Sequence, residues 1–142
     1  MADLEMVKRI GAGDHGLAVI AVARPSGTVN TSVVNAGVLD DVDSGEACVG
    51  FVARGDAKKV GYIRASGRAA VVFRSGWEWV TVEGAARIIE REGRDAGAYA
   101  TLLRDVFKAA GGTHDDWDEY DRVMAAEGRV AVLVQPERIT SN

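Results

Sequence analysis

The sequence predicts a mainly β protein, built as a small antiparallel barrel of six strands with helices packed over it. Two observations indicate this fold class. Short apolar segments separated by turn residues follow one another from residue 17 to residue 91, and the longest helical stretches lie in residues 93–127, before a last apolar segment. A parallel doubly wound sheet would instead need a helix between successive strands. We therefore predict one domain, residues 1–142, with an N-terminal helix in residues 1–11 and a helical insertion in residues 93–127.

The composition is that of an ordinary globular protein. Of 142 residues, 47% are hydrophobic and 27% are charged, and the formal net charge is −4. This charge disfavours a general nucleic-acid binder, because such proteins carry a surplus of basic residues. The single cysteine excludes an internal disulfide. No apolar run approaches about 18 residues and no secretory leader is visible, so we predict a cytoplasmic protein without membrane or nucleic-acid partners.

The first third of the chain predicts a helix followed by three strands. Three apolar residues at helical spacing indicate a short amphipathic helix that ends at Gly11. Residues 17–23 and 29–39 predict a β-hairpin, and residues 46–53 predict a third strand after an acidic turn. The glycine spacing of residues 11–16 matches a dinucleotide fingerprint, but a helix precedes it and a strand follows it, which is the reverse of the order that binds a pyrophosphate.

Four polar residues interrupt the apolar pattern of the second strand, namely Asn30, Thr31, Ser32 and Asn35. Buried amides and hydroxyls need hydrogen-bond partners, from the protein or from a ligand. The alternative is that these side chains are satisfied within the core or lie on an exposed face of the sheet. We expect Asn35 to be buried, where it could orient a bound ring or a substrate carbonyl.

The loop at residues 53–59 carries a concentration of charge at the start of a predicted helix. Arg54 ends the third strand, Asp56 is the expected N-cap, and Lys58 and Lys59 fall in the first helical turn. Cations are disfavoured at a helix N-terminus, where the free N–H groups already carry partial positive charge. A bound phosphate would compensate them, because it accepts hydrogen bonds from the amides and pairs with Arg54 and Lys58. The alternative is two solvated lysines on a surface turn.

Two further strands follow, at residues 68–74 and from residue 74 to about residue 91. With a period of two, the second of these has Val80 and Val82 on a core face and Trp77 and Trp79 on the opposite face. Two neighbouring exposed indoles suit a second protein surface or a flat aromatic ligand better than water. Gly84 interrupts the strand and predicts a bend.

The remaining elements are two helices and a sixth strand. Helical spacing of apolar residues predicts helices at residues 96–110 and 113–124, and residues 129–135 predict the last strand. His114 lies beside three aspartates, which could suggest a metal site, but a capping role for Thr113 and for the carboxylates explains the same residues. We therefore predict no metal site.

Three segments together resemble the actinobacterial pyridoxamine 5'-phosphate oxidase-like family, and most closely its branch of deazaflavin, or coenzyme F(420), dependent oxidoreductases. They are residues 54–59 (RGDAKK), 76–84 (GWEWVTVEG) and 111–124 (GGTHDDWDEYDRVM). The resemblance covers residues 17–138. It implies a six-stranded antiparallel split β-barrel of the FMN-binding type, which forms a homodimer and binds one cofactor at each interface.

Carried over by position, the resemblance implies the residues of the cofactor site. The implied phosphate-binding residues are Arg54 and Lys58, with Lys59 close by. The strand that lines the ring contributes Ser32, Val34 and Asn35, and the interface aromatics are Trp77 and Trp79. Lys59, Arg64 or Arg68 could pair with the oligoglutamate tail of coenzyme F(420). Relatives often carry an arginine at position 56, where this chain has Asp56, and an aromatic residue near the C-terminus, where it has residues 139–142.

The resemblance implies a coenzyme F(420)H2-dependent reductase that transfers a hydride to an electron-poor acceptor, such as a quinone, an enone or a tetrapyrrole. Because the cofactor carries this chemistry, no side chain is predicted to be catalytic. One alternative is an oxidoreductase of the same fold that binds FMN. Another is a protein that binds a cofactor, haem or lipid without turnover. The sequence does not identify the acceptor.

Overall fold

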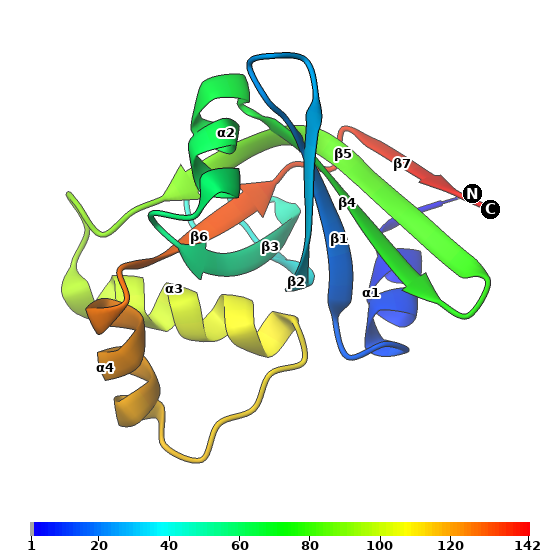
Figure 1. The fold of residues 1–142 in the computed structure, drawn as a ribbon. Helices are drawn as coiled ribbons and strands as arrows, with labels where there is room; N and C mark the ends of the chain where they lie inside the picture. Colours follow the sequence, from blue (N-terminus) through cyan, green and yellow to red (C-terminus); the bar gives the residue numbers. More distant parts are fainter. Residues whose placement is uncertain (1) are drawn as a thin grey trace.

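The computed structural model describes residues 2–142 and shows a closed antiparallel β-barrel with helices packed around it (Figure 1). Six strands pair in the ring β1, β2, β3, β6, β5, β4 and back to β1, so the predicted fold class is confirmed. The bounds of these strands are β1 Leu17–Ala23, β2 Val29–Asp40, β3 Ala47–Arg54, β4 Arg68–Ser75, β5 Glu78–Ile89 and β6 Arg129–Val134.

Four helices are described, α1 Leu4–Ala12, α2 Lys58–Ser66, α3 Ala96–Ala109 and α4 Trp117–Ala126. Helices α3 and α4 lie between β5 and β6 in the sequence, in the predicted helical segment, and they pack together against one side of the barrel (Figure 1). The predicted end of the first helix at Gly11 is early, because the helix continues to Ala12. None of the helices in residues 2–142 is long and apolar enough to cross a bilayer.

Side chains point alternately inward and outward along the strands, and the inward-pointing ones fill the barrel. Ile20, Phe51 and Phe73 point inward and have at most 1% of their surface exposed. Strand β5 is bent, as predicted, because residues 78–85 pair with β4 and residues 86–89 pair with β6. A Cβ atom on Gly84 would lie 1.8 Å from the carbonyl oxygen of Gln135, so only glycine fits where the backbones meet at this corner.

Three sequence predictions of detail are wrong. A seventh strand, β7 (Arg138–Ser141), pairs with β5 after the predicted last strand. Helix α2 begins after Ala57, which makes no side-chain cap, and the Asp56 carboxylate lies beside Arg54 instead. Helix α4 is capped by Asp116, not by Thr113, because the Asp116 side chain accepts from the N–H of Glu119.

The ring of strands is split between β2 and β3 along part of its length. Residues 36–40 of β2 pair with β3, whereas residues 29–35 pair only with β1 within the described chain. On the other side of the opening, the end of β3 pairs with β6 as far as Arg54. The unpaired edge of β2 and the end of β3 therefore form the two sides of a split in the barrel.

The acidic turn between β2 and β3 is tied to the helical segment through Asp43. Its Oδ2 lies 2.9 Å from Nη2 of Arg94 and 2.6 Å from Nη1 of Arg87. Hydrogen bonds from Arg94 and then Arg87 lower the pKa of Asp43 to about 2. Because the folded pKa is below the ordinary value of about 4, this contribution to stability is present above pH 4 and is lost as the pH falls toward 2.

Replacing Asp43 with asparagine is therefore expected to make the melting temperature less dependent on pH between about pH 4 and pH 2. Thermal unfolding of both proteins across this range measures the effect. A variant with an acid dependence as steep as that of the wild type would show that Asp43 does not contribute in this way.

Candidate functional site

A groove follows the split between β2 and β3. It holds a cavity of about 310 Å³ that is lined by strand residues from both sides of the split and by three cations. Its lining residues are Val33, Val34, Asn35, Val52, Ala53, Arg54, Ala57, Lys59 and Arg129. Four residues that the sequence predicted for the cofactor site, Val34, Asn35, Arg54 and Lys59, thus lie around one cavity.

Three cations gather at one end of the groove. Arg54 and Arg129 are direct partners across β3 and β6, and Lys59 follows in the first turn of α2. Arg54 contacts Asp56 at 3.4 Å and Glu127 at 3.7 Å, and Arg129 contacts Glu127 at 3.0 Å. Like charges placed opposite each other repel, so this end of the groove is suited to an anion.

Lys59 is the least compensated of these cations. Burial, and then the positive charge of Arg129, lower its pKa. Within residues 2–142 it forms no salt bridge, and α2 has neither a side-chain cap nor an acidic residue in its first turn. The neighbouring Lys58, which the sequence favoured as the phosphate ligand, is exposed and does not line the cavity.

The structure corrects the placement of the polar residues on β2. Asn35 is exposed rather than buried, and its Nδ2 donates to the carbonyl oxygen of His15 at 3.0 Å. This bond fixes the amide at the wall of the groove. Ser32 points to the interior and does not line the groove, and its Oγ and the Oδ1 of Asn30 are buried without a hydrogen-bond partner. Thr31 is exposed.

A second cavity of about 210 Å³ continues the groove toward the helices. It shares Asn35, Val52 and Arg129 with the first cavity, and its other lining residues are Val106, Phe107, Ala110, Tyr120 and Met124. The rings of Phe107 and Tyr120 lie 5.0 Å apart at an angle of 31°. The groove is therefore cationic at one end and apolar and aromatic at the other.

The Tyr120 hydroxyl is held in its protonated form. It donates to the carbonyl oxygen of Leu103 at 3.2 Å, and burial raises its pKa to about 12. Tyr120 therefore contributes its ring to the groove, but its hydroxyl is not a base at neutral pH.

The two predicted interface tryptophans lie far from this groove within one chain. Trp77 is in the turn before β5, not in the strand, and is 93% exposed, whereas Trp79 lies within β5. Three strand spacings, or about 14 Å, separate β5 from β2 through β4 and β1. Within one chain, these indoles therefore do not line the groove.

The outer face of this part of the barrel is apolar. Val33, Val19 and Val72 are neighbours across β2, β1 and β4, with Val33 63% and Val19 41% exposed. Trp79 lies on the same face, two residue pairs farther along β5, opposite Arg74. Val33 also lines the groove, so the apolar face and the groove are continuous.

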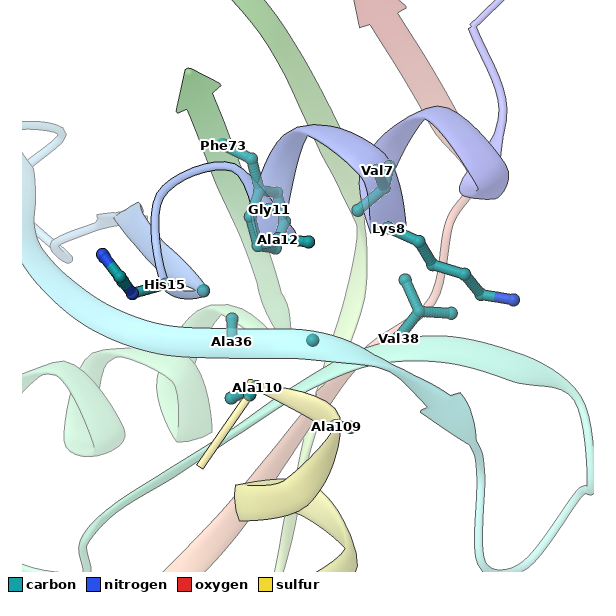
Figure 2. A pocket seen from close by; sticks show the side chains of 13 residues that line it. Val7, Lys8, Gly11, Ala12, His15, Ala36, Val38, Phe73, Ala109 and Ala110 are labelled. Carbon is teal, nitrogen blue, oxygen red and sulfur yellow. The ribbon is translucent and has the colours of Figure 1, made fainter. Parts of the chain in front are cut away.

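A cavity of about 390 Å³, larger than either cavity of the groove, lies elsewhere, between α1, β2 and the end of α3 (Figure 2). Glycines and alanines form most of its wall, and Figure 2 shows Lys8 and His15 at opposite ends. Lys8 already pairs with Glu5 at 3.0 Å. We place the candidate site in the groove instead, because there uncompensated charge and aromatic side chains meet.

The segment around His114 has a structural role. Nδ1 of His114 accepts from the N–H of Asp116, and its ring packs 5.9 Å from Trp117. Within residues 2–142 there is no group of three or more His, Cys, Asp or Glu side chains that could hold a metal ion.

No protein-family model matches the sequence, and the comparison with curated proteins gives no match. Solved structures do share the fold. A pyridoxamine 5'-phosphate oxidase-related, FMN-binding protein from Nostoc punctiforme is similar with a TM-score of 0.62 at 9% identity, over 96% of this chain and 82% of that one.

An F420 reductase is similar with a TM-score of 0.58 at 18% identity, over 87% of this chain and 88% of that chain. A haem storage protein from Vibrio cholerae is similar with a TM-score of 0.60 at 11% identity, over 99% and 94% of the two chains. The chain thus has the split-barrel fold of FMN-binding proteins and of an F420 reductase, and at these identities the likeness concerns the fold alone.

Proposed function

We propose that this protein is an oxidoreductase that binds a flavin-type cofactor in the groove between β2 and β3, and that it acts as a coenzyme F(420)H2-dependent reductase. The observation that supports this most is the groove itself. It places three cations at one end, of which Lys59 forms no salt bridge within residues 2–142, and an aromatic cavity at the other end. A ligand with a phosphate and a flat heterocycle requires such a pair of surroundings. FMN is the alternative cofactor.

In this proposal the cationic end holds the phosphate. Lys59 provides an ammonium group, Arg54 and Arg129 provide planar donors, and the first turn of α2 provides N–H groups without a side-chain cap. Arg64 and Arg68, which could meet an oligoglutamate tail, are already paired with Glu90 and Glu137. A tail would have to compete with these carboxylates.

The ring lies along β2 and β3 in the same proposal. Val34 and Val52 provide apolar contact, and the Asn35 amide, fixed by its bond to His15, can hydrogen-bond to a polar edge of the ring. Phe107 closes the far side. Ser32 would need a movement of β2 to reach a ligand.

When bound, reduced coenzyme F(420) supplies a hydride to an electron-poor acceptor. The side chains of this protein then need only to hold donor and acceptor in contact and to exclude water. Val106, Phe107 and Met124 provide apolar surface for the acceptor beside Asn35. We assign no side chain a proton-transfer role. Quinones, enones and tetrapyrroles remain the acceptor classes to test.

We also propose that the protein is a homodimer through the apolar face that contains Val19, Val33 and Val72. Exposed apolar rows of this kind are typical of protein interfaces, and a twofold axis would place the same row of two copies together. Because Val33 borders the groove, the partner would cover the open side of the cofactor site. Trp77 and Trp79 of the partner are then available to enclose the ring.

Cofactor titration tests the proposed function. We expect purified protein to bind coenzyme F(420) with a dissociation constant of about 1 to 10 μM, or about −7 to −8 kcal/mol. The reduced cofactor should then be oxidised faster with one of the acceptor classes in a single-turnover experiment. Binding of FMN but not of F(420) would favour the alternative cofactor, and binding without accelerated oxidation would favour a non-catalytic binder.

Haem binding has less support than a flavin-type cofactor. The chain has two histidines, and neither His15 nor His114 lines the groove. A haem in the groove would therefore have no histidine ligand from this chain.

A further inference from the structure

Glu127 lies beside the two arginines at the cationic end of the groove. One of its oxygens, Oε1, accepts from Nε of Arg129 at 3.0 Å and lies 3.0 Å from Nη2 of the same side chain. The other, Oε2, lies 3.7 Å from Nη1 of Arg54. A single carboxylate thus bridges the two arginines that face each other across β3 and β6.

Local helix energetics do not explain a glutamate at this position. Glu127 is the C-cap residue of α4, and no basic residue lies in the last turn of this helix. The C-terminus of a helix carries partial negative charge, so a carboxylate there is disfavoured. The contacts with Arg54 and Arg129 offset this cost, which indicates that Glu127 serves the cationic cluster and not the helix.

The backbone around Glu127 is fixed while its side chain remains accessible. The N–H of Gly55 donates to the carbonyl oxygen of Gly128 at 2.9 Å and joins the turn after β3 to the turn before β6. A Cβ atom on Gly55 would lie 2.9 Å from that oxygen. The side chain of Glu127 is 34% exposed and therefore borders solvent.

Taking the proposed anion site as its premise, we propose that Glu127 is a resident counter-ion that a ligand phosphate displaces, and that it makes the site selective for phosphate over carboxylates. Without ligand, it neutralises part of the charge of Arg54 and Arg129. A ligand carboxylate that displaced Glu127 would exchange one single negative charge for another, so its gain in binding free energy would be small. A phosphate monoester carries about −1.5 to −2 charges at pH 7 and three acceptor oxygens, so it gains from the exchange.

The test compares wild type with the variant Glu127→Gln, which keeps the shape and removes the charge. Inorganic phosphate and acetate are titrated at constant ionic strength, and binding is measured by calorimetry and by the shift in melting temperature. We expect the wild type to bind phosphate but not acetate. The variant should bind phosphate about tenfold more tightly, and it should now also bind acetate.

Glu119→Gln is the matched control. It makes the same change of charge on the same helix, at an exposed residue that does not line the groove. Unlike Glu127, Glu119 forms no salt bridge with Arg54 or Arg129 within residues 2–142. The phosphate affinity of Glu119→Gln should therefore equal that of the wild type. An equal gain in phosphate affinity in both variants would mean that only the net charge of the protein matters, and this would overturn the proposal.

Two other results would also contradict the role of Glu127. A lower phosphate affinity in Glu127→Gln would show that the carboxylate orients the arginines for the ligand, and an unchanged affinity would show that it does not compete.

Repeating the titration with FMN and F(420) separates the counter-ion role of Glu127 from the proposed function. If neither cofactor binds while phosphate binding still strengthens in the variant, the proposed function fails and the counter-ion role holds. If a cofactor binds both proteins equally, the function holds and the counter-ion role fails.

Discussion

Replacing Lys59 with alanine is expected to weaken cofactor binding about thirtyfold while leaving the protein as stable as the wild type. A hydrogen bond to a charged group contributes about 1.5 to 3 kcal/mol, and about 2 kcal/mol corresponds to this change in affinity. Stability should not fall, because Lys59 is partly desolvated and repelled by Arg129, as the lowered pKa of its ammonium group shows. Titration with F(420) and FMN, together with thermal unfolding, measures both quantities.

Lys58→Ala is the control for this experiment. The two lysines are adjacent and chemically identical, but Lys58 is exposed and lies outside the groove. We expect its removal to change affinity less than about threefold. If Lys58→Ala were the more damaging substitution, Lys58 would be the phosphate ligand, as the sequence alone predicted, and the groove would not be the phosphate site.

Replacing Val33 with aspartate is expected to convert the proposed homodimer to a monomer and to weaken cofactor binding at the same time. In a twofold interface the substitution places two carboxylates on apolar surface, at a cost of about 2 kcal/mol or more each. The dissociation constant of the dimer should therefore rise at least about a thousandfold. Sedimentation equilibrium over a range of protein concentrations measures this change.

Val42→Asp provides the matched control, because Val42 is 49% exposed in the turn between β2 and β3, away from the apolar row. It should leave both the dimer and the cofactor affinity unchanged. A wild-type protein that stays monomeric at high concentration would reject the homodimer. A Val33→Asp protein that remains dimeric would place the interface on another face.

Most of the fold could be predicted from the sequence because its signals are local. The six barrel strands and the bend at Gly84 follow from periodicity of two and from glycine in a strand. Strand β7 could not be predicted in this way, because it has four residues, follows Pro136 closely and is defined only by its pairing with β5. The N-cap of α4 was misplaced because Thr113 and Asp116 are both good capping residues, and only the folded loop distinguishes them.

The candidate site was predicted in part. Arg54 and Lys59 share one loop with a local electrostatic signal, whereas Arg129 and Glu127 join them only through the pairing of β3 with β6. The alternation of inward-facing and outward-facing residues along β2 contained information on the orientation of Asn35 that the sequence analysis did not use. Because Val34 faces inward, Asn35 must face outward. Phe107 and Tyr120 could not be predicted as site residues, because the helical spacing of apolar residues does not distinguish a core face from a cavity wall.

A crystal structure of the protein with FMN or coenzyme F(420) bound tests the central claim most directly. We predict that the phosphate lies within about 3 Å of Nζ of Lys59 and contacts Arg54 or Arg129, with the ring between β2 and Phe107. A phosphate bound elsewhere, with the ammonium group of Lys59 directed to solvent and the groove empty, would contradict it.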